Sequence, residues 1–402
     1  MQINQMLFLF IDVVLLAIAL ILLIPVAVLF LECSAALLSG FRPTTETKAP
    51  RPKVAVLIPA YNEAAGIAAT ISTILPQLTA DDRLLVIADN CTDATAQIAR
   101  NCGASAIERQ DTERKGKGYA LDFGLQSIES DPPEVVIMVD ADCICGPDAL
   151  ETLARVAVAS SRPVQATYLM EQPPNPTPKD SISALAFLVK NLVRPSGLKQ
   201  LGYPSLLTGT GMAFPWSIIR SVSLASGNIV EDMQMSLDLA IAGHPAVFCP
   251  EAKVTGCLPQ QQQAAKSQRT RWEHGHIQTL LTQTPRLATA SVQQKRFDLL
   301  AIALDLSVPP LSLLVAIWLA AFAASLLAAT FGTSPIPAVL LAVQGLLILV
   351  SIVGAWAKFG RAADISGLTL LSVPFYILWK IPLYLGFLLK RQTKWVRTER
   401  DV

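Results

Sequence analysis

The sequence predicts an α/β domain with a parallel sheet, enclosed between membrane-spanning helices. Hydrophobic residues make up 52% of the 402 residues and charged residues only 16%, a composition that indicates membrane segments. Long apolar stretches stand near both ends of the chain. Between them, short apolar runs rich in β-branched residues alternate with helical patterns. This alternation is typical of a parallel sheet covered by helices on both faces.

The first apolar stretch covers residues 6–31. A helix of that length crosses the roughly 30 Å hydrocarbon core of a bilayer. No Lys or Arg precedes it, whereas four cations follow at Arg42, Lys48, Arg51 and Lys53. The positive-inside rule then places the N-terminus outside and the next domain in the cytoplasm. We therefore expect an N-terminal transmembrane helix within residues 1–40 and a proline-containing linker at 41–52.

Residues 53–298 are the predicted cytoplasmic domain. The expected strands are 54–58, 84–88, 104–108 and 135–139, and the expected helices are 63–75, 93–100, 117–128 and 147–157. In open α/β sheets ligands bind at the carboxyl ends of the strands. A further helix at 182–194 has a broad apolar face and several cations. Both a core helix and a helix at the membrane surface fit this pattern, and we favour the membrane surface.

Residues 299–390 are predicted to return to the membrane, with apolar segments at about 304–331, 336–356 and 368–389. The loop with Lys358 and Arg361 and the basic tail at 391–402 both favour the cytoplasm. If all three C-terminal segments cross in addition to the N-terminal helix, the loop and the tail fall on opposite sides of the membrane. The last segment also contains Pro374, Lys380 and Pro382. We therefore expect two or three C-terminal spans, with the last segment as the candidate for a re-entrant or interfacial position.

The strand at 135–139 ends in Asp140-Ala141-Asp142. Residues at i and i+2 of an extended chain point the same way, so the two carboxylates can converge. Two anionic oxygen donors suit a hard divalent cation such as Mg²⁺ or Mn²⁺. Taken alone, the pattern is better explained by a solvated strand end, because Asp-x-Asp is common by chance.

Five other polar stretches occur along the chain, three before the paired aspartates and two after them: Ile58–Glu63, Ile87–Asp93, Lys115–Leu121, Val230–Asp232 (with Gly209-Thr210-Gly211-Met212 upstream) and Gln268–Trp272. Each has an ordinary explanation, such as a helix cap or a surface cation–π pair. Their joint occurrence between membrane segments favours one shared site.

Composition excludes several classes of function. The net charge of +1 offers no basic patch for a nucleic acid. The seven cysteines are scattered, without the spacing of a zinc site or a disulfide framework, which fits reduced thiols in the cytoplasm. No Ser/His/Asp arrangement is evident.

With these motifs the chain resembles the family 2 glycosyltransferases, membrane-bound inverting enzymes. The resemblance covers residues from about 53 to 280. It points to the branch that includes cellulose, hyaluronan, chitin and poly-N-acetylglucosamine synthases and ceramide glucosyltransferase. The matching residues are Asp89, Asp140-Ala141-Asp142, Glu231-Asp232 and Gln268-x-x-Arg271-Trp272. The resemblance implies a GT-A type, Rossmann-like nucleotide-sugar-binding domain flanked by transmembrane helices.

The resemblance also implies residue roles in the reaction. Asp232 would be the catalytic base. Asp142 would be the direct ligand of Mn²⁺ or Mg²⁺, and Asp140 would contact the ribose of the nucleotide or, through water, the metal. Lys117 and Arg271 would approach the diphosphate. Val230 stands where the family usually carries Thr, a position that shapes the loop and leaves the role of Asp232 in place.

Nucleotide and acceptor contacts complete the implied site. Asp89 would read the base, expected to be uracil, and the turn with Pro59, Tyr61 and Glu63 would pack around base and ribose. Trp272 would form an apolar wall at the acceptor site, and Gln268 would orient the acceptor or the nucleotide.

The expected activity is transfer of a sugar from a UDP-hexose to a lipid-linked or glycolipid acceptor, in exopolysaccharide or cell-surface glycan synthesis. Four apolar segments are few for a polymer channel, and a processive polysaccharide synthase is the alternative. We expect membrane lipids and proteins of a glycan assembly pathway as partners, no nucleic acid, and a bacterial inner-membrane location with the catalytic domain in the cytoplasm.

Overall fold

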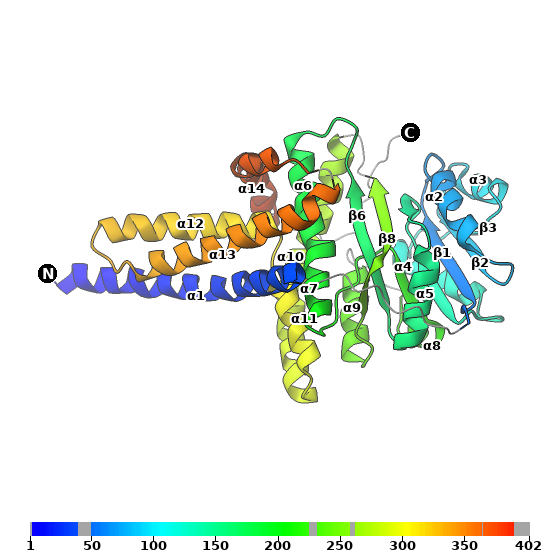
Figure 1. Ribbon diagram of the computed structural model, residues 1–402, viewed down its shortest axis with the longest axis horizontal. Helices are drawn as coiled ribbons and strands as arrows, with labels where there is room; N and C mark the ends of the chain where they lie inside the picture. The colour runs from blue at the N-terminus through cyan, green and yellow to red at the C-terminus, as the bar shows by residue number, and fades with distance from the viewer. Residues whose placement is uncertain (1, 39–49, 225–230, 258–261, 364, 390–402) are drawn as a thin grey trace. The chain divides into compact units, whose positions relative to one another are not determined.

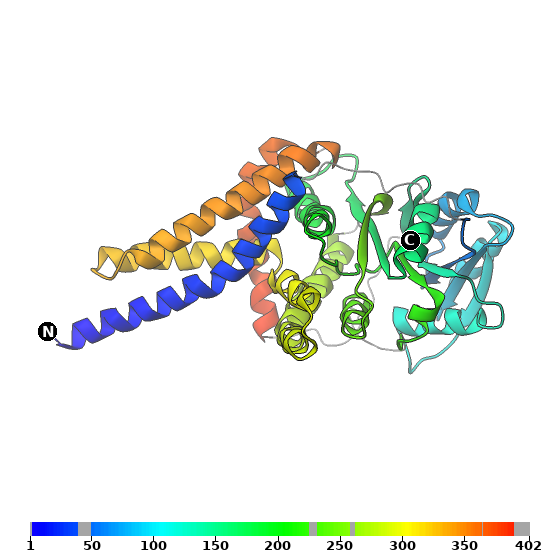
Figure 2. The ribbon, with the colours of Figure 1, turned by 60° about the horizontal axis from the view of Figure 1, so that its bottom comes forward.

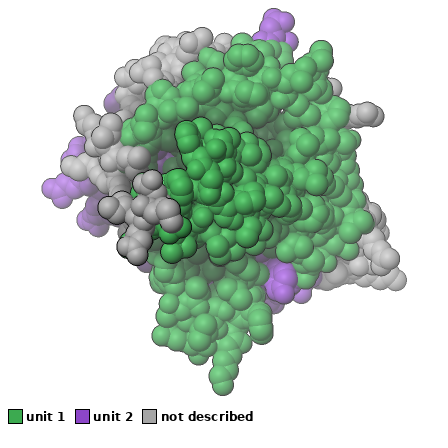
Figure 3. All heavy atoms as spheres, turned by 90° about the vertical axis from the view of Figure 1, so that its left-hand side faces the viewer, with its two compact units in different colours: residues 1–39, 176–201, 276–391 green, residues 40–175, 202–275, 392–402 purple. Residues whose placement is uncertain are grey.

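The computed structural model describes residues 2–38, 50–224, 231–257, 262–363 and 365–389. The chain forms two compact units (Figure 3). Unit 1 contains Met1–Ser39, Pro176–Leu201 and His276–Arg391, and unit 2 contains Gly40–Asn175, Gly202–Gly275 and Gln392–Val402. Residues 176–201 and 276–298, inside the predicted range 53–298, therefore pack with the first helix in unit 1. Val230, most of the predicted linker and the basic tail lie outside the described residues.

Unit 2 is built on an eight-stranded sheet in the order β3-β2-β1-β4-β7-β6-β8-β5. The strands are β1 (Val54–Ala60), β2 (Arg83–Asp89), β3 (Ser105–Arg109), β4 (Val135–Met138), β5 (Cys143–Cys145), β6 (Val164–Glu171), β7 (Met212–Pro215) and β8 (Val247–Cys257). The four strands expected from the sequence are all present. They form the parallel half of the sheet, in which β1 pairs with β2 and β4, and β2 pairs with β3.

The parallel arrangement predicted from these four strands does not extend to the strands beyond β4. Strand β7 runs antiparallel to both β4 and β6, and β5 runs antiparallel to β8. The sheet is therefore mixed, although β6 and β8, which are neighbours in this half, run parallel to each other. The parallel half still sets the site, since Ala60, Ala88 and Glu108 end up level with one another along neighbouring strands.

Helices cover the sheet of unit 2 (Figure 1). They are α2 (Ile67–Ile74), the 3₁₀ turn η1 (Leu75–Gln77), α3 (Thr95–Asn101), α4 (Lys117–Ser127), α5 (Ala149–Ser160), α8 (Trp216–Ile219), α9 (Glu231–Ile241) and the start of α10 (Gln262–Gln294). The core under α4 includes the buried side chains of Leu57, Ile87, Leu125 and Phe214. Helix α2 begins four residues later than predicted. The reason is that Glu63 closes a turn, with its carbonyl accepting from the N–H groups of Gly66 and Ile67.

Unit 1 is helical (Figures 1 and 2). Its elements are α1 (Gln2–Leu38), α6 (Pro178–Leu188), the π-helical turn η2 (Val189–Val193), α7 (Arg194–Gln200), the rest of α10, α11 (Phe297–Ser307), α12 (Leu311–Thr330), α13 (Ile336–Phe359), the 3₁₀ turns η3 (Gly360–Ala363) and η4 (Gly367–Ser372), and α14 (Val373–Leu389). Four segments among the described residues are long and apolar enough to cross a membrane: Gln5–Leu38, Leu311–Thr330, Ile336–Phe359 and Gly367–Phe387.

Two details of the helical unit differ from the sequence prediction. The predicted segment 304–331 is interrupted, because Pro309 and Pro310 separate α11 from α12. The predicted helix 182–194 is divided among α6, η2 and α7. The carboxylate of Asp12 accepts a hydrogen bond at 2.9 Å from the backbone N–H of Ser334. This bond ties the N-terminal part of α1 to the loop between α12 and α13.

A buried ionic cluster joins three helices of unit 1. The Nε–H of Arg194 donates to Oε2 of Glu32 at 2.6 Å, and its Nη2 donates to the carbonyl of Asp305 at 2.7 Å and to the Asp305 carboxylate. All three side chains are at most 10% exposed. The guanidinium of Arg194 thereby neutralises charge that would be costly to bury unpaired, and it fixes α7 against α1 and α11.

Candidate active site

The paired aspartates lie where β4 runs out. The N–H of Asp140 donates to Oγ1 of Thr210 at 3.0 Å, and the hydroxyl of Thr70 donates to the carbonyl of Ala141 at 2.7 Å. Thr70 and Thr210 are themselves buried. The loop with Asp140 and Asp142 is therefore held from α2 on one side and from the loop before β7 on the other, with both carboxylates half-buried.

This pair fits a divalent cation. Ligand atoms of Asp140, Asp142 and Cys143 lie within 4.8 Å of one another. Cys143 is fully buried, and burial raises the pKa of its thiol, so the sulfur is a protonated and weak donor. The two carboxylates remain as hard oxygen donors of the type that Mg²⁺ and Mn²⁺ prefer.

Lys117 reaches the aspartates from the start of α4, the helix that precedes β4. Gly116 has a φ of +128°, and Lys117 is the first residue of α4. Its ammonium group forms an ion pair with Asp140 and donates to the carbonyl of Gly209 at 2.6 Å. The basic turn of the sequence thus brings a cation to the carboxyl edge of the sheet.

Gly209 is the point at which Asp232 joins this group. Its φ is +93°, and a Cβ built on it would lie 3.0 Å from Oδ2 of Asp232 and 3.7 Å from Nζ of Lys117. Lys117 and Asp232 also line one cavity together with hydrophobic side chains of α4, β7 and α9. Asp140, Lys117 and Asp232, which are far apart in the sequence, therefore meet around one glycine. The side chain of Glu231 lies outside the described residues.

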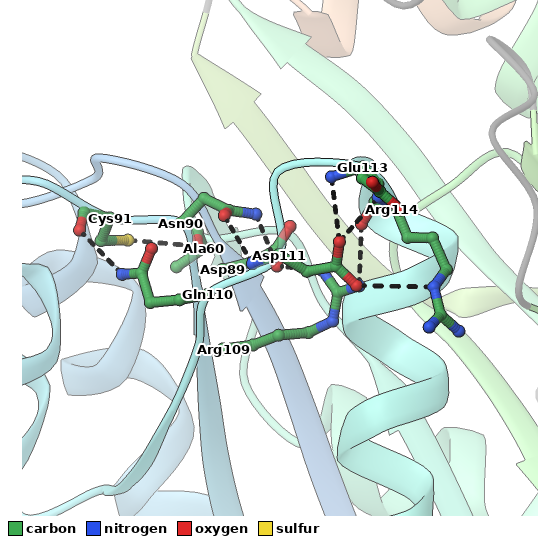
Figure 4. Close-up of polar contacts among 9 residues, drawn as sticks. All are labelled: Ala60, Asp89, Asn90, Cys91, Arg109, Gln110, Asp111, Glu113 and Arg114. Carbon is green, nitrogen blue, oxygen red and sulfur yellow. Dashed lines mark hydrogen bonds and ion pairs between the residues drawn. The ribbon is translucent and has the colours of Figure 1, made fainter.

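Asp89 is bound by a residue that the sequence analysis missed. Nη1 of Arg109 donates to Oδ1 of Asp89 at 2.6 Å, and the side-chain amide of Asn90 donates to the same oxygen at 3.1 Å (Figure 4). Both members of the ion pair are nearly buried, with 11% and 9% of their side chains exposed. Burial raises the pKa of the Asp89 carboxyl, although Arg109 acts in the opposite direction. The sequence signal was weak, because Arg109 is simply the last residue of β3 and stands opposite Asp89 in register.

Arg109 also organises the loop that leads to Lys117. Its Nη2 donates to Oδ2 of Asp111 at 2.9 Å and to the carbonyl of Arg114 at 2.8 Å. Oδ1 of Asp111 in turn accepts from the N–H groups of Glu113 and Arg114 (Figure 4). One guanidinium therefore connects the end of β2 to the loop before α4.

The turn after β1 packs against the turn after β2. Asn62, with a φ of +51°, accepts a hydrogen bond from the N–H of Thr92 at 2.8 Å. The N–H of Glu63 donates to the hydroxyl of Thr95 at 2.8 Å. Glu63 is buried, and Pro59 and Tyr61 are half-buried. The structure thus joins the predicted 59–63 turn to the loop that follows Asp89.

The last predicted group lies on α10. Gln268, Arg271 and Trp272 stand at i, i+3 and i+4, so they share one face of the helix. Gln268 is buried, whereas Arg271 and Trp272 are half-buried.

The mixed α/β sheet has GT-A glycosyltransferases as its structural neighbours, which places the chain in the GT-A fold class. Residues 50–275 match the model of the family described as "Glycosyltransferase like family 2", and the chain belongs to this family. The expected glycosyltransferase family and the GT-A fold class are therefore confirmed, and the narrower branch of the family stays a prediction.

Two curated relatives match part of the chain. The low-salt glycan biosynthesis hexosyltransferase Agl6 of Haloferax volcanii is 36% identical over 96 residues, which are 23% of this chain and 21% of Agl6. Protein RfbJ of Shigella flexneri is 33% identical over 89 residues, 22% of this chain and 64% of RfbJ. The matched region spans less than two thirds of either relative.

A solved structure is similar over almost the whole chain. The mannosyltransferase PcManGT from Pyrobaculum calidifontis, in complex with GDP-Man and Mn²⁺, superposes with a TM-score of 0.58 and covers 95% of this chain and 100% of its own. The two sequences are 18% identical, so the likeness concerns the fold.

Proposed function

We propose that this protein transfers a hexose from a UDP-hexose to a lipid-linked acceptor at the cytoplasmic face of a bacterial inner membrane, with inversion at the anomeric carbon. The proposed pathway is synthesis of exopolysaccharide or another cell-surface glycan. The observation that carries the proposal is the meeting of Asp140, Lys117 and Asp232 around Gly209 at the carboxyl edge of the sheet. The four apolar segments that could cross a membrane support a membrane-bound acceptor.

In the proposed reaction Asp232 is the general base. A neutral acceptor hydroxyl is a weak nucleophile, so its proton passes to the Asp232 carboxylate as the new bond to the anomeric carbon forms. The bond from that carbon to the diphosphate oxygen breaks at the same time. A single displacement of this kind inverts the anomeric centre and requires no nucleophile from the protein.

Asp142 is the proposed direct metal ligand, and Asp140 contacts the ribose or, through water, the same ion. When bound, Mn²⁺ or Mg²⁺ supplies Lewis-acid stabilisation of the charge that develops on the diphosphate. Lys117 is already held between Asp140 and Gly209, so its ammonium is positioned beside the proposed phosphate site without further ordering.

Asp89 is the proposed reader of uracil. Because Arg109 and Asn90 both donate to Oδ1, the carboxylate is fixed in one orientation, and its other oxygen accepts from the base N–H in our proposal. Pro59, Tyr61 and Glu63 form the turn that packs around base and ribose.

The face of α10 supplies the remaining proposed contacts. Arg271 has a guanidinium suited to bidentate contact with the diphosphate. Trp272 is the wall of the acceptor site, and Gln268 orients the acceptor or the nucleotide. These residues, with Asp89, Asp142 and Asp232, are the basis for placing the chain in the branch of cellulose and hyaluronan synthases and ceramide glucosyltransferase.

The activity is tested by giving radiolabelled UDP-glucose, UDP-galactose, UDP-N-acetylglucosamine and GDP-mannose to membranes that contain the protein, with Mn²⁺ or Mg²⁺. We expect label from one UDP-hexose in the lipid extract, on a short product. Label from GDP-mannose alone would contradict the proposal that Asp89 reads uracil. A long polymer would instead identify a processive synthase, and no transfer above membranes lacking the protein would contradict the proposed function.

Removal of divalent cations tests the metal site. We expect EDTA to lower transfer by about 10²–10³-fold, the effect of losing several kcal/mol of charge stabilisation. Mn²⁺ or Mg²⁺ should restore it in the unsubstituted protein but not in Asp142→Asn, and Asp122→Asn on the surface of α4 is the matched control. Transfer that is insensitive to EDTA would exclude the metal role of Asp142.

Gly209→Ala tests the meeting point of the three charged residues. A Cβ there would lie 3.0 Å from Oδ2 of Asp232 and would also strain a φ of +93°, so we expect transfer to fall at least about tenfold. Gly202→Ala is the control, because Gly202 has a φ of +78° and no atom within 4 Å of its Cβ position. The Gly202→Ala protein should therefore lose a comparable free energy of unfolding through the strained φ but keep its rate of sugar transfer. Equal transfer rates in the two variants would contradict the assigned role of Gly209.

A further inference from the structure

We infer that α14 lies along the cytoplasmic surface of the membrane, with its apolar face against lipid, and that the protein crosses the bilayer only three times. Helix α14 is part of an apolar segment, Gly367–Phe387, that is long enough to cross. Its placement within unit 1 argues against a crossing. The inference concerns the lipid surface as a binding partner and does not depend on the transferase activity.

Helix α14 has two distinct faces. Its solvent-exposed side carries Phe375 (74% exposed), Leu378 (63%) and Leu385 (51%), which recur at intervals of three and seven residues and therefore form one stripe. The opposite side packs into the protein with Tyr376, Ile377 and Lys380, each at most 6% exposed. A stripe of this kind requires an apolar environment.

The contacts of the buried face fix the direction of the helix. The hydroxyl of Tyr384 lies 2.6 Å from that of Ser312, in the first turn of α12. Tyr384 is eleven residues beyond Val373, the start of α14. In a helix crossing the bilayer alongside α12, Tyr384 would lie about 16 Å deeper than Val373. Instead Tyr384 is level with the start of α12, the helix terminus that carries Ser312.

The other end of α14 is held at a polar helix terminus. The hydroxyl of Tyr376 lies 2.9 Å from that of Ser183 in α6, and Nζ of Lys179 lies 4.8 Å from the centre of the Trp379 ring. Residues 177–180 form the capped start of α6. Figures 1 and 2 agree with these contacts, because α14 runs across the direction shared by α1, α12 and α13.

The same end of the bundle is the expected cytoplasmic end. Lys358, near the end of α13, donates to the carbonyls of Ala36 and Leu37 at 2.9 Å, so α1 and α13 finish together. The cations after α1 assign this end to the inside. With three crossings, the basic residues after α14 also remain inside, which removes the conflict in the charge pattern.

The lysine and the aromatic side chains of α14 also fit a position at the membrane surface. Lys380 is in the middle of α14 and its Nζ lies 5.4 Å from the centre of the Tyr376 ring and 5.9 Å from that of Trp379. In a crossing helix this ammonium would lie near the bilayer centre, where a charge is costly. In a surface helix the rings of Tyr376 and Trp379 lie in the interfacial zone that aromatic side chains favour, and the ammonium of Lys380, which faces the protein, stays outside the hydrocarbon core.

Depth measurements on the full-length protein test the inference. Spin labels are placed through Phe375→Cys, Leu378→Cys and Leu385→Cys in vesicles of phosphatidylethanolamine and phosphatidylglycerol, and depth is read from collision with oxygen and a nickel chelate. The chain without an introduced cysteine measures the background. Leu319→Cys, on the exposed side of α12, is the control for a deep position.

We expect the three α14 labels to lie at one shallow depth, within a few Å of each other, and the Leu319→Cys label to lie deeper. For a crossing helix, residues 375 and 385 would differ by about 15 Å. A gradient of that size, or a label at Leu378 much deeper than its neighbours, would overturn the inference. A reporter fused after Val402 should be active in the cytoplasm, and activity outside would likewise overturn it.

Discussion

We expect Asp232→Asn to lower the rate of sugar transfer by about 10²–10⁴-fold, the range that a positioned general base contributes. The amide keeps the size of the side chain but cannot accept the acceptor's proton. Asp232 already lies beside Gly209 and Lys117, so the donor should bind with little change. The measurement is steady-state transfer with donor titration, supported by binding of UDP to the variant.

The control for this variant is Asp122→Asn. Asp122 accepts a hydrogen bond from Gln126 at 2.7 Å on α4 and does not belong to the proposed site residues, so its substitution should leave transfer unchanged. Both variants should unfold at the same temperature as the unsubstituted protein. Full transfer in a folded Asp232→Asn protein would show that another group takes the proton.

We expect Arg109→Gln to lower both the free energy of unfolding and the affinity for the nucleotide sugar. It removes the partner of a nearly buried Asp89 and releases the loop that Asp111 and Arg114 form before α4. Breaking a buried ion pair from one side costs about 3–5 kcal/mol. We also expect the KM for the nucleotide sugar to rise about tenfold or more, equivalent to about 1.4 kcal/mol of binding, because Asp89 is no longer held in one orientation.

Two further variants separate positioning from simple destabilisation. Arg100→Gln removes an exposed pair with Glu108, a class of interaction worth at most about 1 kcal/mol, and should leave KM unchanged. Arg109→Lys restores the charge but not the forked geometry, so it should recover part of the stability while KM stays raised. A normal KM in folded Arg109→Gln protein would mean that Arg109 acts only on stability.

The sequence determined the parallel half of the sheet and the apolar segments long enough to cross a membrane, because both depend on local patterns. Apolar runs predicted β1, β2 and β4, the place of 104–108 in the strand–helix alternation predicted β3, and the length of the apolar stretch predicted α1. The positions of Asp140 and Asp142 at a strand end also followed from residue order. Such features need only the alternation and length of apolar runs.

The antiparallel strands and the ionic partners could not be predicted in this way. Whether β7 joins β4 from the far side depends on the path of the chain, and the pairing of Asp89 with Arg109 depends on the register of β2 and β3. Neither leaves a pattern within a short window of sequence. The same holds for Gly209, whose importance depends on Asp232 arriving from α9.

The sequence by itself determined that paired aspartates stand at the end of a buried strand and that the chain has four apolar segments. Only the tertiary structure decided which groups meet those aspartates and how the last apolar segment is placed. The physical reason is that composition and periodicity fix which surfaces are apolar and where carboxylates stand along the chain. Contacts between distant residues, such as Lys117 with Gly209 or Ser312 with Tyr384, are fixed by packing.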